Sequence, residues 1–569
     1  MSTYRLILVF PAFILSMLFV SRAAAQAKTY DEEVTVVAPF DPIVPDAFKI
    51  SQNPVADDTA TKVPIMNYDI TPRIANVLPV IEPLPAVKLL AEPISKLYRN
   101  YLRAGVGNYS AFYGELFMNS LRSKQQMTTF HLKHQSAAGT LNDAGPTTNS
   151  RNEVDLTATK YLSEHTFTSK AFYYRDGLHL YGYKPGDYQD TVIKKDDIKQ
   201  HYNKVGVATS FMSNYKSLDK LNHSLGLSFY HLAGFYQNTE NNVAITASLN
   251  KKVNLIEIGK NQMLGANASY TFLNQHDSLG HINSGLLLLQ PFIKAEVNEY
   301  SLMAGFKVNI ASDTVTNGHI YPVAEAKLEL IPNALKLYAG MDGGIERMSL
   351  NGAISENLFV SSVLPWKYVN DKFHIYGGLQ SNISRSFNFN ASISSSTYSN
   401  YPLFVTDTNA YLLNSFTLRY DNVSVLQIKA ELEFIKTSHL RLALNGSYFH
   451  YKTDQQPYAW YKPDYVFEFN GRYDIQNKLA FTAKMLVNGP VWALKPIRNQ
   501  ASNEIKKPIH LEAFKLDGWA DISLGTEYAF SKALSFWLTM NNLANSRYYQ
   551  WYNYRTYGLN ILGGVSYSF

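Results

Sequence analysis

The side chains that could carry out catalysis or hold a metal ion are scattered along this chain. Its 14 histidines include one close pair, His131 and His134, and the sequence contains no cysteine. Residues three positions apart in a strand point to opposite faces, so these two histidines are not expected to bind one metal ion together. We predict two unrelated polar side chains here, no metal site and no cofactor.

No arrangement typical of an enzyme is found elsewhere. The sequence has neither a phosphate-binding Gly-rich loop with Lys-Ser/Thr nor a Gly-x-Ser-x-Gly turn between a strand and a helix. The absence of cysteine excludes thiol chemistry and disulfides. A net charge of +6 is mild for 569 residues and argues against a nucleic-acid partner. We therefore predict no catalytic residues, with a barrel-embedded hydrolase as the enzymatic alternative.

Strand-like alternation dominates the chain from residue 97 onwards. Between residues 426 and 434 apolar residues alternate with polar ones: Leu426, Ile428, Ala430, Leu432 and Phe434 against Gln427, Lys429, Glu431 and Glu433. A period of two is typical of a strand with one apolar and one polar face. Similar runs lie on both sides of Pro332-Asn333, where we expect a tight turn.

Composition and length favour a membrane barrel over a soluble sheet protein. Aromatic residues make up 14% of the chain, charged residues only 17%, and mean hydropathy is −0.18. Membrane barrels combine lipid-facing apolar residues, polar lumen residues and aromatic girdles. A single soluble core stops growing at about 250–300 residues, and residues 97–569 contain no evident linker or blade-like repeat. We predict an all-β fold: a transmembrane antiparallel β-barrel of about 20 strands (about 18–22) in contact with outer-membrane lipid.

Two regions precede the predicted barrel. Arg5, the apolar stretch from Leu6 to Val20 and the small residues Ala23-Ala24-Ala25 are typical of a signal peptide, so we assign residues 1–25 to one. Its removal takes away two arginines and no acidic residue, which lowers the net charge from +6 to +4. Residues 27–96 contain ten prolines, against 12 in residues 97–569. Because proline donates no backbone hydrogen bond, residues 26–96 are predicted to be an extended segment, in the periplasm or in the lumen.

The predicted barrel also implies an orientation. An even number of strands leaves both chain ends in the periplasm, so short connections such as the one at Pro332-Asn333 belong to that side. Longer polar segments are predicted to be extracellular: 139–152, 182–197, 399–409 and 490–509.

The last strand has a pattern that resembles the segment recognised by the barrel-assembly machinery. Its apolar residues lie on one face of a strand that ends in an aromatic residue: Leu559, Ile561, Val565, Tyr567 and Phe569. The resemblance implies that this machinery is a partner of the chain during insertion.

The hairpins before this strand resemble the closing hairpins of TonB-dependent receptors. The matching features are Asp521 near a strand start, the pair Asn542-Leu543 followed by Tyr548, and the final strand ending in Phe569. The close fit covers residues 515–569, while the opening strands around Asn108-Tyr109 are similar to barrels of Bacteroidota-type bacteria. The resemblance implies a Gram-negative outer-membrane protein involved in transport.

The N-terminal region departs from that family. TonB-dependent receptors carry a plug domain inside the barrel, and the proline-rich residues 26–96 are too short for a full one. One fragment is similar to the TonB box, a strand that pairs with the energy-coupling protein: Glu32, Glu33, Val34, Thr35, Val36, Val37 and Ala38. We therefore expect a receptor-like barrel that lacks a full plug.

Charged residues on the polar strand faces should line the lumen. They are of both signs: Arg99, Arg103, Glu115, Lys133, Glu325, Lys327, Glu329, Lys429, Glu431 and Glu433. They are consistent with a wet solute path, and rather more with a salt-bridge network that fills the interior.

Two functions fit these observations. The first is a transport barrel, either a pore or a receptor with a reduced plug, whose lumen is filled by residues 26–96, by inward-folded loops or by a partner. The second is a scaffold that transports nothing and docks a periplasmic or outer-membrane protein through residues 26–96, using extended backbone for pairing.

Overall fold

The computed structural model describes residues 98–120, 123–188, 192–254, 260–384, 386–437, 439–497 and 510–569. All of them belong to one compact unit, Glu92–Phe569. The predicted signal peptide, the proline-rich segment and the TonB-box-like residues Glu32–Ala38 lie outside the described residues. No helix in the described part of the chain is long and apolar enough to cross a membrane.

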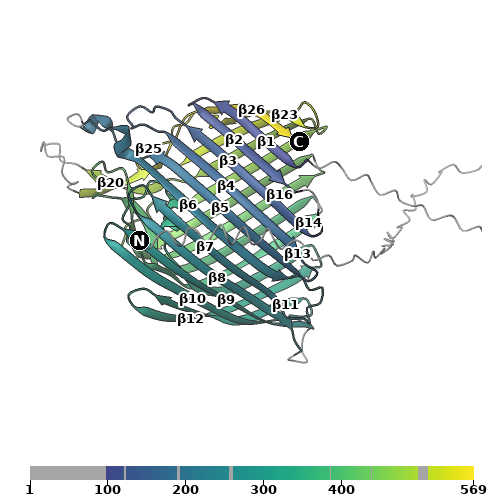
Figure 1. The fold of residues 1–569 in the computed structure, drawn as a ribbon. Coiled ribbons are helices and arrows are strands. Elements are labelled where there is room, and N and C mark those ends of the chain that lie inside the picture. Colours follow the sequence, from purple (N-terminus) through teal and green to yellow (C-terminus); the bar gives the residue numbers. More distant parts are fainter. Residues whose placement is uncertain are drawn as a thin grey trace, which may run out of the picture. The chain divides into compact units, whose positions relative to one another are not determined.

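Twenty-two of the described strands form one antiparallel sheet that closes on itself. β1 (Asn100–Gly107) pairs with β2 (Ala111–Asn119) on one side and with β26 (Asn560–Ser568) on the other. This first-to-last pairing turns the sheet into a barrel (Figure 1). It confirms the predicted fold class, and 22 strands lie at the upper limit of the predicted range.

The other barrel strands pair mostly in chain order. β19 pairs directly with β22, and the long connection between them is not part of the barrel sheet. Their bounds are β3 (Gln126–Ala137), β4 (Asn149–Tyr161), β5 (His165–His179), β6 (Lys199–Ser213), β7 (Asn222–Gly234), β8 (Thr239–Lys252), β9 (Lys260–Asp277), β10 (Gly280–Val297), β11 (Tyr300–Ser312), β12 (Thr316–Ile331), β13 (Leu335–Arg347), β14 (Tyr368–Ser384), β15 (Phe387–Thr406), β16 (Phe416–Lys436), β17 (Leu440–Thr453), β18 (Tyr465–Ile475), β19 (Leu479–Asn488), β22 (Trp519–Ala529) and β23 (Leu534–Asn541).

The alternation in the sequence determines which side chains face lipid. In β16, Ile428 exposes 47% of its surface on the outside of the barrel, and the neighbouring Gln427 and Lys429 are on the opposite face. Apolar side chains outside and polar ones inside are the arrangement that a bilayer requires. The ladder closes without a free edge, so the backbone groups of the barrel strands are paired within the wall.

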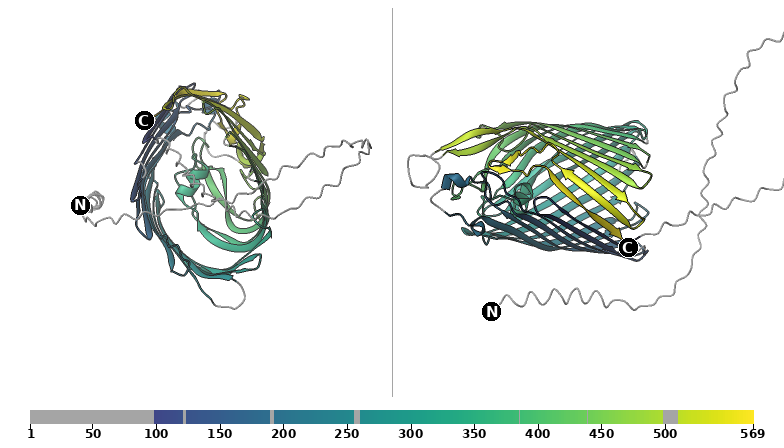
Figure 2. Two further views of the ribbon diagram at one scale, coloured as in Figure 1. Left: turned by 90° about the vertical axis from the view of Figure 1, so that its right-hand side faces the viewer. Right: turned by 90° about the horizontal axis from the view of Figure 1, so that it is seen from above.

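The two ends of the barrel differ in the length of their connections (Figure 2). At the short-turn end, β12 and β13 are joined by a tight turn in which Asn333 has a φ of 60°, as predicted. β1 begins and β26 ends there, and the Arg99 N–H donates to the Phe569 carbonyl over 3.1 Å. The opposite, long-loop end carries the large connections between β3 and β4, β5 and β6, β13 and β14, β15 and β16, β17 and β18, β19 and β22, and β23 and β26.

Three of the predicted long loops are shorter than expected. Residues 149–152, 399–406 and 491–497 are in strands rather than loops. The reason is that β15 and β16 contain 20 and 21 residues, whereas about 9–11 residues cross a bilayer. In the upper part of β15, Leu403, Phe404 and Val405 are consecutive apolar residues that are all buried against the loops, so the alternation that marks a strand in the sequence is lost there.

Several of the long connections pack together at the long-loop end. They contain the helix α2 (Leu350–Glu356), the short 3₁₀ turns η1 (Pro185–Tyr188) and η2 (Lys195–Ile198), and two hairpins, β20 (Val491–Ile497) with β21 (His510–Leu516) and β24 (Tyr549–Trp551) with β25 (Tyr554–Arg555). Their apolar residues form one buried cluster. In the view along the barrel axis, α2 lies inside the ring of strands (Figure 2).

Candidate functional site

The predicted lumen charges form pairs along the barrel wall. Lys327 contacts Glu325 at 2.7 Å and Lys429 contacts Glu431 at 2.5 Å, while the guanidinium of Arg103 lies 4.3 Å from the centre of the Trp537 ring. Among the described barrel strands, every ion pair joins residues of the same strand or of strands no more than two apart. These pairs coat the wall and do not bridge the lumen.

His131 and His134 lie on opposite faces of β3, as their spacing predicts. His131 contacts Glu115 at 3.1 Å and Asp155 at 3.5 Å, whereas His134 contacts Asn152 at 2.7 Å. Within the described ranges, no group of three or more histidine, aspartate or glutamate side chains is placed to hold a metal ion.

The final strand presents its apolar face to the outside. Ile561, Val565, Tyr567 and Phe569 are all exposed there, whereas Leu559 precedes the strand. The Phe569 N–H donates to the Asn100 carbonyl over 3.0 Å, so the last residue joins the barrel seam. Its recognition by the assembly machinery stays a prediction.

The receptor-like residues Asp521, Asn542 and Tyr548 come together at the last long connection. The Tyr548 hydroxyl donates to Asp521 Oδ2 over 2.9 Å, and the Asn542 N–H donates to Asp521 Oδ1 over 3.2 Å. Asn542 Nδ2 donates in turn to the Tyr557 carbonyl over 2.9 Å. Asn542 has a φ of 50°, a conformation that asparagine tolerates better than most residues. These residues hold the connection between β23 and β26 in place.

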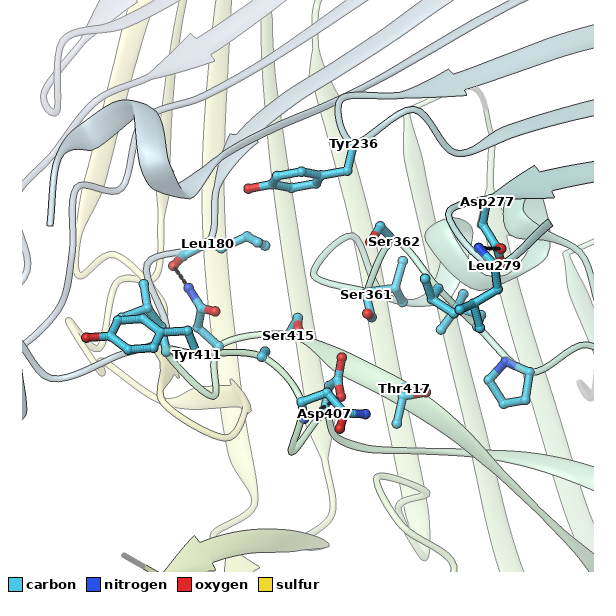
Figure 3. Close-up of a pocket in the computed structure, with 18 of the residues that line it drawn as sticks. Leu180, Tyr236, Asp277, Leu279, Ser361, Ser362, Asp407, Tyr411, Ser415 and Thr417 are labelled. Carbon is cyan, nitrogen blue, oxygen red and sulfur yellow. Dashed lines mark hydrogen bonds between the residues drawn. The ribbon is translucent and has the colours of Figure 1, made fainter. Parts of the chain in front are cut away.

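The main candidate site is a cavity of about 1070 Å³ at the long-loop end, which we call the loop cavity (Figure 3). Its lining comes from the β5–β6 connection, the β7–β8 and β9–β10 turns, the β13–β14 connection, and the β15–β16 connection with the adjoining strand residue Thr417. Ligand pockets commonly have volumes of about 300–1,000 Å³, so this cavity has room for a sizeable solute.

Hydrogen bonds between connections give the loop cavity a defined wall. Asn414 Nδ2 donates to the Leu180 carbonyl over 2.6 Å and so joins two segments that are 234 residues apart (Figure 3). The Ser361 N–H donates to the Phe416 carbonyl over 2.8 Å, and the Phe416 N–H donates to the Phe359 carbonyl over 3.0 Å. The β13–β14 connection is therefore bound to the start of β16.

Aromatic contacts also support this wall. The Tyr554 ring stacks on Phe359 at 3.7 Å and meets Tyr181 edge-on at 4.8 Å, and its hydroxyl donates to the Asn414 carbonyl. Burial raises the pKa of Tyr554 well above its ordinary value, so the hydroxyl stays a donor at neutral pH. These contacts fix the position of Asn414, which lines the cavity.

Helix α2 is bound to the barrel wall at its N-terminus. Glu240 of β8 is fully buried and accepts hydrogen bonds from the Leu350 N–H and, over 3.2 Å, from the Asn351 N–H. Lys204 Nζ of β6 donates to Asn351 Oδ1 over 2.7 Å. The first N–H groups of a helix have no partner within it, so a carboxylate there both satisfies them and interacts favourably with the helix dipole.

The C-terminal end of α2 has a second anchor. Glu356 Oε1 lies 2.5 Å from Lys462 Nζ, which comes from the β17–β18 connection. Burial alone would lower the pKa of Lys462, but Tyr401 and Glu356 raise it above its usual value. Lys462 therefore stays positively charged at neutral pH, and α2 is held at both ends.

Sequence reasoning did not find the loop cavity, although the predicted loop 399–409 contains Asp407 and Asn409 of its lining. The cavity residues follow no period, and they come from connections far apart in the chain. Pairs such as Leu180 and Asn414 meet only once the barrel is closed.

Comparisons with known proteins support the fold. No family model matches this chain, and no curated protein matches it. Among solved structures, it is similar to the siderophore receptor PirA from Acinetobacter baumannii, with a TM-score of 0.62 and 10% identity over 84% of this chain and 81% of the receptor. It is also similar to the pyoverdine outer membrane receptor FpvA from Pseudomonas aeruginosa, with a TM-score of 0.61 and 11% identity over 84% and 79%. The FrpB iron transporter from Neisseria meningitidis gives a TM-score of 0.61 and 9% identity over 84% and 82%.

These likenesses define the class of protein. The chain is a closed β-barrel with the fold of outer-membrane siderophore receptors such as PirA and FpvA. At identities of 9–11% the likeness concerns the fold.

Proposed function

We propose that this protein is an outer-membrane transport barrel that takes up a solute at the loop cavity. The observation that carries the proposal is a cavity of about 1070 Å³ at the long-loop end of a 22-strand barrel with the fold of solute receptors. Concave sites with a few polar groups are the usual places for small-molecule binding. The long-loop end is then the extracellular side, and the short-turn end faces the periplasm.

In this proposal the lumen is closed by two elements. Helix α2 narrows the extracellular side, and the proline-rich residues 26–96 act as a reduced plug. The TonB-box-like strand Glu32–Ala38 then provides the contact with the energy-coupling protein. The polar inner wall with its short-range ion pairs supports a hydrated path, because these charges are neutralised locally.

The reduced plug can be tested in proteoliposomes. The chain from residue 26 and a form that starts at residue 92 are reconstituted, and entry of a small neutral sugar is followed. We expect faster entry for the shorter form, because the barrel seam between β1 and β26 is complete without residues 26–91. Equal rates for both forms would show that residues 26–91 do not obstruct the lumen.

The alternative function is a scaffold, favoured by the ten prolines between residues 27 and 96. Extended proline-rich chain is a common docking segment. Crosslinking in native membranes tests it: a stoichiometric partner attached through residues 26–96 supports the scaffold. A barrel that is consistently recovered alone would contradict it.

A further inference from the structure

The loop cavity has an uneven charge. Three carboxylates line it, those of Asp197, Asp277 and Asp407. Among its described lining residues the only basic side chain is that of His281, and there is no lysine or arginine. None of the three forms an ion pair with a described residue. Asp407 is buried, and a buried carboxylate without a cation is unfavourable. The cavity therefore favours a positively charged occupant.

A second observation is independent of these carboxylates. Ser415 of the β15–β16 connection lines the cavity (Figure 3) and exposes only 5% of its surface. Its carbonyl accepts from the Asp407 N–H over 2.8 Å, which fixes its position, and its hydroxyl has no hydrogen-bond partner among the described residues. A hydroxyl oxygen in a cavity wall can accept a hydrogen bond from a bound donor.

Local hydrogen bonds hold two of the carboxylates in position. Asp277 Oδ1 accepts from the Leu279 N–H over 2.8 Å in the turn that Gly280 completes with a φ of 143°. Asp407 Oδ1 accepts from the Asn409 N–H over 2.9 Å. In each carboxylate the local turn uses one oxygen, so the other is available to a ligand.

The remaining lining suits an amine. Tyr236, Tyr411 and Trp366 provide aromatic surface, and a cation above an aromatic ring is attracted to the negative face of the ring. In Figure 3, Tyr236, Asp277 and Asp407 belong to three separate connections around the same space. An ammonium group brings both a positive charge and several N–H donors, which satisfy the carboxylates and the Ser415 hydroxyl together.

We propose that the loop cavity selects multiply protonated amines, such as a short basic peptide or a polyamine, over neutral or anionic solutes. This inference rests on the proposed function, in which the loop cavity is the entry site of the transported solute. It names the class of that solute from the cavity alone.

Calorimetric titration of the purified chain tests the proposal. Tetralysine is the probe, with tetraglutamate as the anionic comparison. The double substitution Asp277→Asn/Asp407→Asn removes two charges and keeps each side-chain oxygen that the turns require. The matched control, Asp143→Asn/Asp454→Asn, removes two exposed carboxylates of the long-loop end that do not line the cavity. We expect tetralysine to bind the wild type and the control, and to bind the cavity variant at least about tenfold more weakly.

Three outcomes would overturn this inference: no binding of tetralysine, equal binding of tetraglutamate, or equal weakening in both double variants. Entry of a neutral sugar into proteoliposomes tests the transport function separately. Sugar entry without tetralysine binding would refute the ligand class and leave the transport function standing. Tetralysine binding by a barrel that admits no solute would support the ligand class and refute the transport function.

Discussion

At the residue scale, Asp521 connects three parts of the receptor-like motif through its carboxylate. Its carboxylate accepts hydrogen bonds from the Tyr548 hydroxyl and the Asn542 N–H, and the Tyr548 ring stacks on Trp519 at 4.3 Å. Charged acceptors make stronger hydrogen bonds than neutral ones. These contacts tie the last long connection to the start of β22.

The substitution Tyr548→Phe tests this role. It removes the hydroxyl that donates to Asp521 and keeps the stacked ring, so we expect the free energy of unfolding to fall by about 1–2 kcal/mol. Denaturant unfolding in detergent measures it. Tyr528→Phe is the control, because the Tyr528 side chain is exposed on the outside of the barrel. Equal stability of both variants would show that the Asp521 contact does not hold the connection.

At the element scale, α2 depends on Glu240 more than on its own sequence. A helix of seven residues is too short to be stable alone, so its order comes from its anchors. In Glu240→Ala the Leu350 and Asn351 N–H groups lose their buried acceptor. We expect amides of α2 to exchange hydrogen about 30-fold faster, which corresponds to about 2 kcal/mol. The exposed Glu299 at the short-turn end serves as the control in Glu299→Ala, and unchanged exchange in Glu240→Ala would refute the anchor.

The strands themselves can be tested through their two faces. Ile428→Lys places a charge on the lipid-facing side of β16, and we expect it to destabilise the folded barrel by about 2 kcal/mol. Gln427→Lys adds the same residue one position away, on the lumen side, and should cost little. Refolding into lipid vesicles under denaturant titration compares them. A similar loss in both variants would contradict the assignment of the two faces.

The strands could be predicted because their signal is local. Residues 426–434 alternate with period two, and the same rule applied along the chain predicted about 20 strands where the structure has 22. The start of β4 was missed because residues 149–152 are polar on both faces. The end of β15 was missed because Leu403, Phe404 and Val405 are apolar and buried on both faces. The loop cavity could not be predicted, because Leu180, Asp277 and Asp407 meet only through the three-dimensional closure of the barrel.

At the scale of the whole molecule, one barrel combines a sealed wall, an outer cavity and an inward-folded helix. The wall is closed by the pairing of β1 with β26, and α2 is fixed to it by Glu240 and to a neighbouring connection by Lys462. A transport barrel requires that such an obstruction can move, whereas a scaffold does not. The two functions therefore differ in what happens when α2 is released.

Solute entry into proteoliposomes after release of α2 tests the transport function most directly. The double substitution Glu240→Ala/Lys462→Met removes both anchors, and it is made in the form that starts at residue 92, so that the proposed plug is absent. Glu299→Ala/Lys532→Met at the short-turn end of the same form is the matched control. We predict that the anchor variant admits a small neutral sugar several times faster than the unsubstituted form and the control. A folded anchor variant that admits sugar no faster than these two would contradict a solute path gated by α2.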